Sequence, residues 1–158
     1  EFRRVLFRSV RELLHTRHVL IPRYCRRVDE FDAVIRRIED CETEAWTDPR
    51  QGLVEWWTLF SADRTPTTEL TAGVAELPVG APRPARGHMH SHAELYYFVS
   101  GSGEVTVNGV TRPVSAGDAV LIPGNAEHLA YNTGNGPLRL LYVFAADSFA
   151  DIKYEFPQ

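Results

Sequence analysis

Residues 88–101 read HMHSHAELYYFVSG, and this stretch decides the fold that we predict for the chain. Side chains alternate between the two faces of a β-strand at about 3.3 Å per residue, so His88 and His90 point the same way, about 6.6 Å apart. Glu94 follows His90 and directly precedes an aromatic and β-branched run, Leu95 to Val99, that is typical of a buried strand. The stretch therefore predicts two imidazoles and one carboxylate within reach of one metal ion.

A second stretch, GDAVLIPGNAEH at residues 117–128, lies downstream and is followed by Asn132. Its short apolar strand, Ala119 to Ile122, ends at a Pro-Gly-Asn turn, and a lone histidine, His128, opens the next strand. His128 is therefore a candidate for a fourth ligand.

Together the two stretches resemble the paired motifs of the cupin superfamily, HxH-x3-E-x6-G and G-x5-P-x-G-x2-H-x3-N. The positions that match, all at the family's spacing, are His88, His90, Glu94, Gly101, Gly117, Pro123, His128 and Asn132. Two positions depart from the pattern, because Asn125 replaces the glycine of the PxG turn and Gly80 lies eight residues before His88 instead of six. Asn tolerates a left-handed backbone, and the displaced glycine predicts a longer entry loop over Gly80 to Gly87. Neither departure affects a ligand.

The resemblance implies an all-β fold, a single small jelly-roll barrel over about Gly52 to Phe156. It also implies that one divalent metal ion is held by His88, His90, Glu94 and His128. Such a ligand set suits a first-row transition metal with one or two positions left open for substrate or water, and it accepts iron, manganese, nickel, cobalt or zinc. We expect His92 to support the ligands or to face solvent, because pairing it with His90 would break the spacing to Glu94.

Three segments are expected along the chain. Residues 1–9, EFRRVLFRS, match what a widely used short-read sequencing adapter encodes in one reading frame, and we exclude them from fold reasoning as a scar. Residues 10–48 are expected to form an N-terminal helical arm with an N-cap at Asp29, and residues 49–158 the cupin domain. Apolar residues recur at helical spacing in the arm at Phe31, Val34, Ile35, Ile38 and Cys41.

The rest of the chain predicts one short strand after another, separated by glycine and proline turns, as in an all-β sandwich or barrel. The Asn108-Gly109 pair between two alternating runs predicts a type I′ hairpin. The expected strands are Leu53 to Phe60, Leu70 to Leu77, Arg86 to Ser91, Leu95 to Ser100, Glu104 to Val107, Val110 to Val114, Ala119 to Ile122, His128 to Asn132, Leu138 to Phe144 and Ile152 to Phe156.

Strand parity also predicts where the large side chains point. Trp56 and Trp57 are adjacent, so one must enter the barrel while the other covers its outer face. Tyr96 and Phe98 share the parity of Glu94 and should project inward beside the metal, whereas Tyr97 should face the other way.

Composition excludes some classes of partner. The 158-residue chain has a formal net charge of −4 and no basic stripe, which argues against nucleic acid or an anionic membrane as partner. No apolar run approaches the length of a membrane span. Two cysteines, Cys25 and Cys41, are too few for a disulfide framework, which favours a reducing, cytoplasmic location. We expect a homodimer, because an amphipathic arm and the outer face of a jelly roll both need cover.

The fold does not decide the function, since cupins include dioxygenases, isomerases, lyases, decarboxylases, ligand sensors and storage proteins. The leading hypothesis is metal-dependent turnover of a small polar or carboxylate-bearing metabolite. As an enzyme, the protein is expected to be an Fe(II) dioxygenase or a lyase, because Glu94 and Tyr96 resemble the Glu-x-Tyr of the small cupin-type dimethylsulfoniopropionate lyases, in which that tyrosine removes a proton. Tyr96 is the candidate catalytic base. The alternative from another class is a non-catalytic sensor or binding module that uses the metal to hold a carboxylate.

Overall fold

The computed structural model of the chain describes residues 33–157. The excluded segment 1–9, the upstream part of the predicted helix and Cys25 therefore lie outside the described residues. The described residues contain no helix that is long and apolar enough to cross a membrane.

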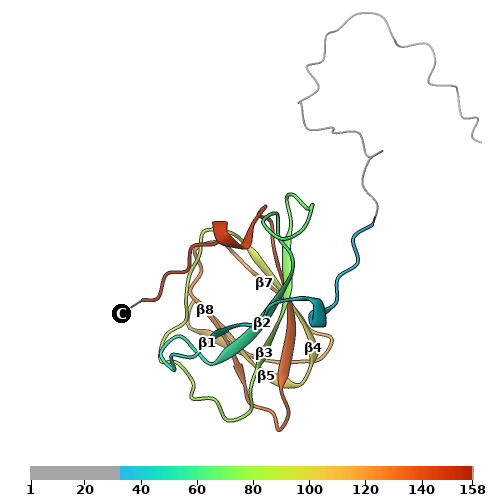
Figure 1. Ribbon diagram of the computed structural model, residues 1–158. Coiled ribbons are helices and arrows are strands. Elements are labelled where there is room, and N and C mark those ends of the chain that lie inside the picture. The colour runs from blue at the N-terminus through green and yellow to red at the C-terminus, as the bar shows by residue number, and fades with distance from the viewer. Residues whose placement is uncertain (1–32, 158) are drawn as a thin grey trace, which may run out of the picture. The chain divides into compact units, whose positions relative to one another are not determined.

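Within residues 33–157, nine strands form two antiparallel sheets (Figure 1). The six-stranded sheet has the order β1-β2-β3-β9-β4-β7, and the three-stranded sheet has the order β6-β5-β8. The strands are β1 (Glu44–Trp46), β2 (Val54–Phe60), β3 (Thr71–Leu77), β4 (Glu94–Ser100), β5 (Ser102–Val107), β6 (Val110–Ser115), β7 (Ala119–Ile122), β8 (His128–Asn132) and β9 (Leu138–Phe144). Two one-turn 3-10 helices, η2 (Ile38–Asp40) and η3 (Phe149–Asp151), flank this array. The predicted all-β jelly roll is confirmed.

Strand alternation builds the core. In β4, Tyr96 and Phe98 are buried and Tyr97 is exposed, as the parity predicts. Phe98 packs in one core cluster with Ile122 of β7 and with Leu138 and Phe144 of β9. Burial of large apolar side chains between the sheets is the main favourable term in such a fold.

The hairpin between β5 and β6 turns at Asn108 and Gly109, and both residues have a positive φ, as a type I′ turn requires. Asn125 also has a positive φ of 63°, which confirms that an asparagine replaces glycine there without losing the left-handed turn.

The helix prediction is wrong over the part that the structure describes. Residues 33–43 form no regular element apart from the single turn of η2, and Glu44–Trp46 form β1 by pairing with β2. Ile35 is 85% exposed, so the apolar stripe of the expected helix has no surface to bury against. Tertiary strand pairing has overridden a local helical pattern.

Two other predicted strands are reduced to single bridges. Within Arg86 to Ser91, His88 bridges His128 and Met89 bridges Glu155, and the second of these bridges is also the only one formed by Ile152 to Phe156. These two segments pair with each other, and the first also pairs with β8, without joining a sheet. Their short pairing places His88 and the C-terminal segment beside one another.

Candidate metal centre and its cavity

The four predicted ligands come from both sheets. Glu94 is the first residue of β4 in the six-stranded sheet, and His128 is the first residue of β8 in the three-stranded sheet. His88 is tied to His128 by two backbone hydrogen bonds, His88 N to His128 O at 3.0 Å and His128 N to His88 O at 2.9 Å. Gly87, directly before His88, has no room for a Cβ, because a Cβ would lie 2.2 Å from the His128 carbonyl oxygen.

The structure brings His88, His90, Glu94 and His128 together in one buried cluster. One ligand atom from each residue can be chosen so that all lie within 4.8 Å of one another. The Nε2 atoms of His90 and His128 lie 3.1 Å and 3.2 Å from the same carboxylate oxygen, Oε2 of Glu94. This arrangement fits a single metal ion.

The backbone fixes the orientation of two of the rings. Nδ1 of His90 lies 2.8 Å from the carbonyl oxygen of His92, and Nδ1 of His128 lies 2.8 Å from that of Ala126. A carbonyl oxygen can only accept, so each neutral ring carries its proton on Nδ1 and directs the lone pair of Nε2 toward Glu94. In this tautomer both lone pairs converge with the Glu94 carboxylate in one buried site, and imidazole ligands whose other nitrogen is held by a backbone carbonyl are typical of metal sites.

His92 supports the cluster through its backbone, not its side chain, which lies outside the cluster. The turn at Pro123 to Ala126 binds the segment that carries His88, His90 and His92, because Asn125 N donates to His90 O at 2.7 Å. A Cβ on Gly124 would lie 2.2 Å from the carbonyl oxygen of Ser91, so this turn and the histidine segment are in direct backbone contact.

His88 stays neutral in the metal-free protein. Burial, and then the proximity of His128 and His90, lowers the pKa of His88 well below its usual value. A neutral imidazole is the form that binds a metal, so the site holds His88 ready as a ligand.

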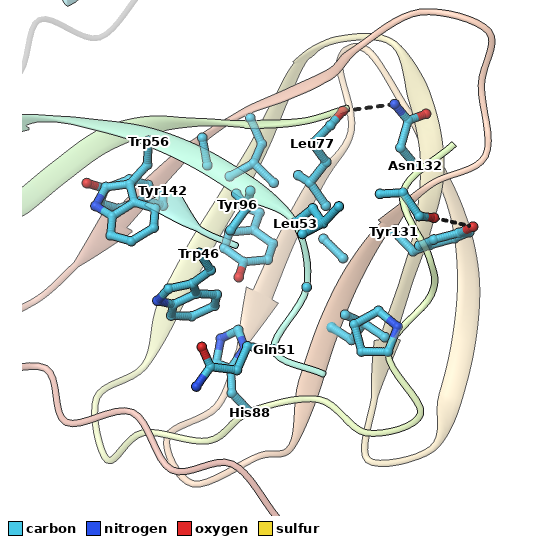
Figure 2. A pocket seen from close by; sticks show the side chains of 18 of the residues that line it. Trp46, Gln51, Leu53, Trp56, Leu77, His88, Tyr96, Tyr131, Asn132 and Tyr142 are labelled. Carbon is cyan, nitrogen blue, oxygen red and sulfur yellow. Dashed lines mark hydrogen bonds between the residues drawn. The ribbon is translucent and has the colours of Figure 1, made fainter. Parts of the chain in front are cut away.

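A cavity of about 90 Å³ opens onto the cluster. His88, Glu94 and Tyr96 line one part of it, which we call its polar end, and Figure 2 shows His88 and Tyr96 there. Aromatic side chains form much of the remaining wall, namely Trp46, Trp56, Tyr142, Phe149 and Tyr154. A space of this size suits a small metabolite and excludes a drug-sized molecule.

Tyr96 lies where strand parity predicts, on the inner face two residues beyond Glu94. Figure 2 shows its hydroxyl directed toward the side of the cavity that holds His88. Burial, and then the negative charge of Glu94, raises the pKa of Tyr96 well above its usual value in the metal-free protein. Tyr96 therefore keeps its proton in the metal-free protein.

A chain of hydrogen bonds through Thr58, Glu44 and Arg64 holds the hydroxyl of Tyr142 in β9. Thr58 donates to Oε2 of Glu44 at 3.1 Å, so its single proton is used, and Tyr142 must donate to Thr58 across 3.0 Å. Arg64 in turn holds both oxygens of Glu44, at 2.8 Å and 3.0 Å. Gly73 separates Thr58 from Tyr142 in the inner row of the sheet and leaves space for the phenol ring.

The sequence motifs did not identify Phe144, whose ring lies 5.1 Å from that of His90, or two further aromatic residues beside the cluster. The ring of Tyr154 lies 5.1 Å from that of His88 and 5.4 Å from that of His90, and the ring of Trp46 lies 5.3 Å from that of His88. The shared parity of Ile152, Tyr154 and Phe156 was the available signal for Tyr154. Trp46 lies within residues 10–48, which were assigned to the helical arm, so its pairing in β1 was not predicted.

The longer entry loop forms part of the cavity wall. Ala81, Pro82 and Pro84 line the cavity, and the hydroxyl of Tyr131 donates to the carbonyl oxygen of Ala81 at 3.0 Å. Arg83 lies 5.4 Å from the centre of the Tyr131 ring and pairs with Glu104 at 2.7 Å. These contacts hold the loop against the three-stranded sheet.

Comparisons with known proteins agree with this geometry. The family model described as a cupin domain matches residues 73–144. The dimethylsulfoniopropionate lyase DddW of Ruegeria pomeroyi is 39% identical over 120 residues, which cover 75% of this chain and 76% of that protein.

Two solved structures show the same fold. A predicted oxalate decarboxylase of Thermotoga maritima superposes with a TM-score of 0.60 and 26% identity, covering 72% of this chain and 99% of that one. An RmlC-like cupin of Shewanella frigidimarina gives a TM-score of 0.53 with 26% identity, covering 72% of this chain and 89% of that one.

Proposed function

Because the chain belongs to the cupin superfamily and carries the cluster described above, we propose that it is a metal-dependent lyase acting on a small carboxylate-bearing metabolite, with dimethylsulfoniopropionate as the first substrate to test. The observation that carries the proposal is that Tyr96 and two of the candidate metal ligands, His88 and Glu94, line one small cavity. The 39% identity to a dimethylsulfoniopropionate lyase supports the choice of substrate.

The residues that line the cavity would suit both ends of this substrate. Dimethylsulfoniopropionate carries a sulfonium cation at one end and a carboxylate at the other. A cation without N–H groups is best held against aromatic faces, and Trp46, Trp56 and Phe149 provide such faces in the cavity wall. The carboxylate would then point to the polar end, toward His88 and Glu94.

The reaction is an elimination in which atoms and charge balance. A base removes a proton from the carbon next to the carboxylate, the electron pair forms the carbon–carbon double bond, and the carbon–sulfur bond breaks to release dimethyl sulfide and acrylate. Bound at the cluster, a divalent cation would stabilise the negative charge that develops on the substrate carboxylate and would lower the pKa of a nearby phenol.

Tyr96 is the residue that we assign to the proton transfer. Its hydroxyl lies at the polar end of the cavity, on the same inner face as Glu94. A phenol with its pKa brought toward neutrality is a usable general base, and its oxygen would accept the proton from the substrate carbon. The aromatic wall and the entry loop would exclude water from the cavity while the Tyr96 oxygen holds this proton.

The test is an assay of the full chain after metal removal and reloading with Fe(II), Mn(II), Ni(II), Co(II) or Zn(II) in separate samples. Dimethyl sulfide measured in the headspace and acrylate measured by chromatography should form in equal amounts, with no oxygen consumed. Oxygen uptake on candidate metabolites would instead favour a dioxygenase. Binding of the substrate by calorimetry without any turnover, in every metal form, would favour a non-catalytic sensor.

A further inference from the structure

A path of side-chain hydrogen bonds runs from the cavity to the protein surface. It begins at Tyr142 in the cavity wall, passes through Thr58 of β2 and ends at Glu44 of β1. Tyr142 and Thr58 are buried, whereas the side chain of Glu44 is 27% exposed. These three side chains, which we call the polar path, therefore connect the cavity with solvent.

Both hydrogen bonds of the polar path point outward. A carboxylate can only accept, so Thr58 donates its proton to Glu44 at 3.1 Å, and Tyr142 donates to Thr58 at 3.0 Å. Gly73 lies between Thr58 and Tyr142 in the sheet, and its lack of a side chain allows the two hydroxyls to meet. Hydroxyls aligned in this direction are set to pass a proton from the cavity to the surface.

The other polar side chains of the cavity wall form no such path within residues 33–157. Tyr131 donates to the carbonyl oxygen of Ala81, and the side-chain amide of Asn132 donates to two further carbonyl oxygens. In the ligand cluster, the Nδ1 atoms of His90 and His128 also face carbonyl oxygens. A carbonyl oxygen has no proton to pass on, so each of these hydrogen bonds ends in the backbone.

We propose that the polar path carries to solvent the proton that the elimination leaves in the cavity. This inference rests on the proposed function, because dimethylsulfoniopropionate yields one proton together with dimethyl sulfide and acrylate. Tyr142 is the register partner of Tyr96, and both phenols line the cavity (Figure 2). The cavity of about 90 Å³ exceeds the roughly 10–15 Å³ that one water molecule needs, so water can link the two phenols once the products leave.

The proton transfer balances without leaving a charge in the interior. When a proton reaches the oxygen of Tyr142, the Tyr142 proton moves to Thr58, and the Thr58 proton moves to Glu44, which gives it to water. Both hydroxyls are neutral before and after, which avoids the cost of a buried charge. Arg64 binds both oxygens of Glu44, at 2.8 Å and 3.0 Å, and keeps this carboxylate in place at the surface. Rotation of the two hydroxyls then restores the outward direction.

The test is steady-state kinetics of the metal-loaded full chain on dimethylsulfoniopropionate. Thr58→Val keeps the shape of the side chain and removes the hydroxyl, so kcat should fall about tenfold or more while kcat/KM stays unchanged. The reason is that proton release follows the irreversible loss of dimethyl sulfide, and kcat/KM reports only the steps up to that loss. The solvent deuterium isotope effect on kcat should be larger in the variant than in the wild type. Thr58→Ser, which retains a hydroxyl, should restore kcat.

Thr71→Val is the matched control. Thr71 is a buried threonine of the same sheet whose hydroxyl donates to the carbonyl oxygen of Ala146 at 2.9 Å, and it does not line the cavity. Its kcat should equal that of the wild type. Melting temperatures establish that the variants are folded, and Tyr142→Phe, which removes the first hydroxyl of the polar path, should lower kcat in the same way should Thr58→Val fail this check.

Three results would overturn the proposal. A wild-type kcat in Thr58→Val would mean that the proton leaves through the opening of the cavity, and the proposed function would stand. Equal losses of kcat and kcat/KM that Thr58→Ser does not restore would give Thr58 a purely structural role. A wild type that forms no dimethyl sulfide in any metal form would refute the proposed function itself, and the polar path with it, because no proton is then released in the cavity.

Discussion

At the scale of single residues, Glu94 connects the site. One of its oxygens faces Nε2 of both His90 and His128, and the other ring nitrogen of each histidine is held by a backbone carbonyl. The ring orientations are therefore set by the fold before any ion arrives. Preorganised ligands lose little freedom on binding, which favours high affinity.

Replacing His128 with alanine should abolish stoichiometric metal binding. The variant loses one of four ligands but keeps the backbone pairing of residue 128 with His88, so the fold should largely survive. After chelation and reloading, elemental analysis should find about one metal ion per wild-type chain and far less in the variant. His92→Ala is the control and should retain its metal, because only the backbone of His92 contacts the cluster. Full occupancy in His128→Ala would refute the ligand assignment.

Tyr96→Phe should lower turnover by about two or more orders of magnitude while leaving the metal content unchanged. The substitution keeps the ring and removes only the hydroxyl, and a lost acid–base group typically costs a factor of about 10² to 10⁴. The measurement is kcat on a metal-loaded enzyme together with elemental analysis. Tyr97→Phe, on the opposite face of the same strand, is the matched control. Turnover equal to wild type in Tyr96→Phe would make Tyr96 a packing residue and point to a metal-bound hydroxide as the base.

At the scale of elements, the inner row of the six-stranded sheet shows how β2, β3 and β9 shape the cavity together. Thr58 and Tyr142 flank Gly73 in this row and hydrogen-bond to each other across it. A glycine in a strand interior normally weakens the strand, so its presence marks a close approach. Here the approach is that of the Tyr142 ring.

Gly73→Ala should therefore destabilise the protein. An ideal Cβ would lie 2.3 Å from the Tyr142 hydroxyl oxygen and 2.4 Å from the Trp57 carbonyl oxygen, and the second of these atoms belongs to the backbone. Overpacking of this kind costs about 1–3 kcal/mol of unfolding free energy, which corresponds to a melting temperature lower by roughly 2–12 °C at about 2–4 °C per kcal/mol. Gly136→Ala is the control, because nothing lies within 4 Å of its Cβ. Equal melting temperatures for the two variants would contradict this account of the inner row.

The sequence pattern predicted the strands in which buried and exposed side chains alternate regularly. The run from Leu95 to Val99 alternates cleanly, and β4 forms there as expected. In the described part of the predicted helix, residues 33–43, no helix beyond one turn forms, because side chains such as Ile35 find no packing partner there. Local spacing does not contain that information. The motif spacing also predicted that His128 and His88 lie in one site. The approach of Trp46 and Tyr154 to His88 depends instead on the pairing of β1 with β2 and of Glu155 with Met89, which the motifs do not encode.

At the scale of the whole molecule, the candidate metal centre joins the two sheets. Glu94 begins a strand of the six-stranded sheet, His128 begins a strand of the three-stranded sheet, and His88 and His90 belong to the segment that precedes β4. An ion held by all four would act as a cross-link between the sheets. Unfolding separates these ligands, so the ion would bind the native state alone.

Metal removal should therefore lower the melting temperature of the whole domain. A ligand that binds only the native state adds RT ln(1 + [L]/Kd) to the unfolding free energy, or about 2.7 kcal/mol at a free concentration one hundred times Kd. For a chain of this size, each kcal/mol corresponds to roughly 2–4 °C, so we expect a difference of about 5–11 °C between reloaded and chelated protein. Calorimetric melts at fixed pH measure this difference. His128→Ala should melt at the same temperature with and without metal, which separates binding at the cluster from unspecific binding at the acidic surface. A wild-type melting temperature that ignores the chelator would show that the cluster does not hold the two sheets together through an ion.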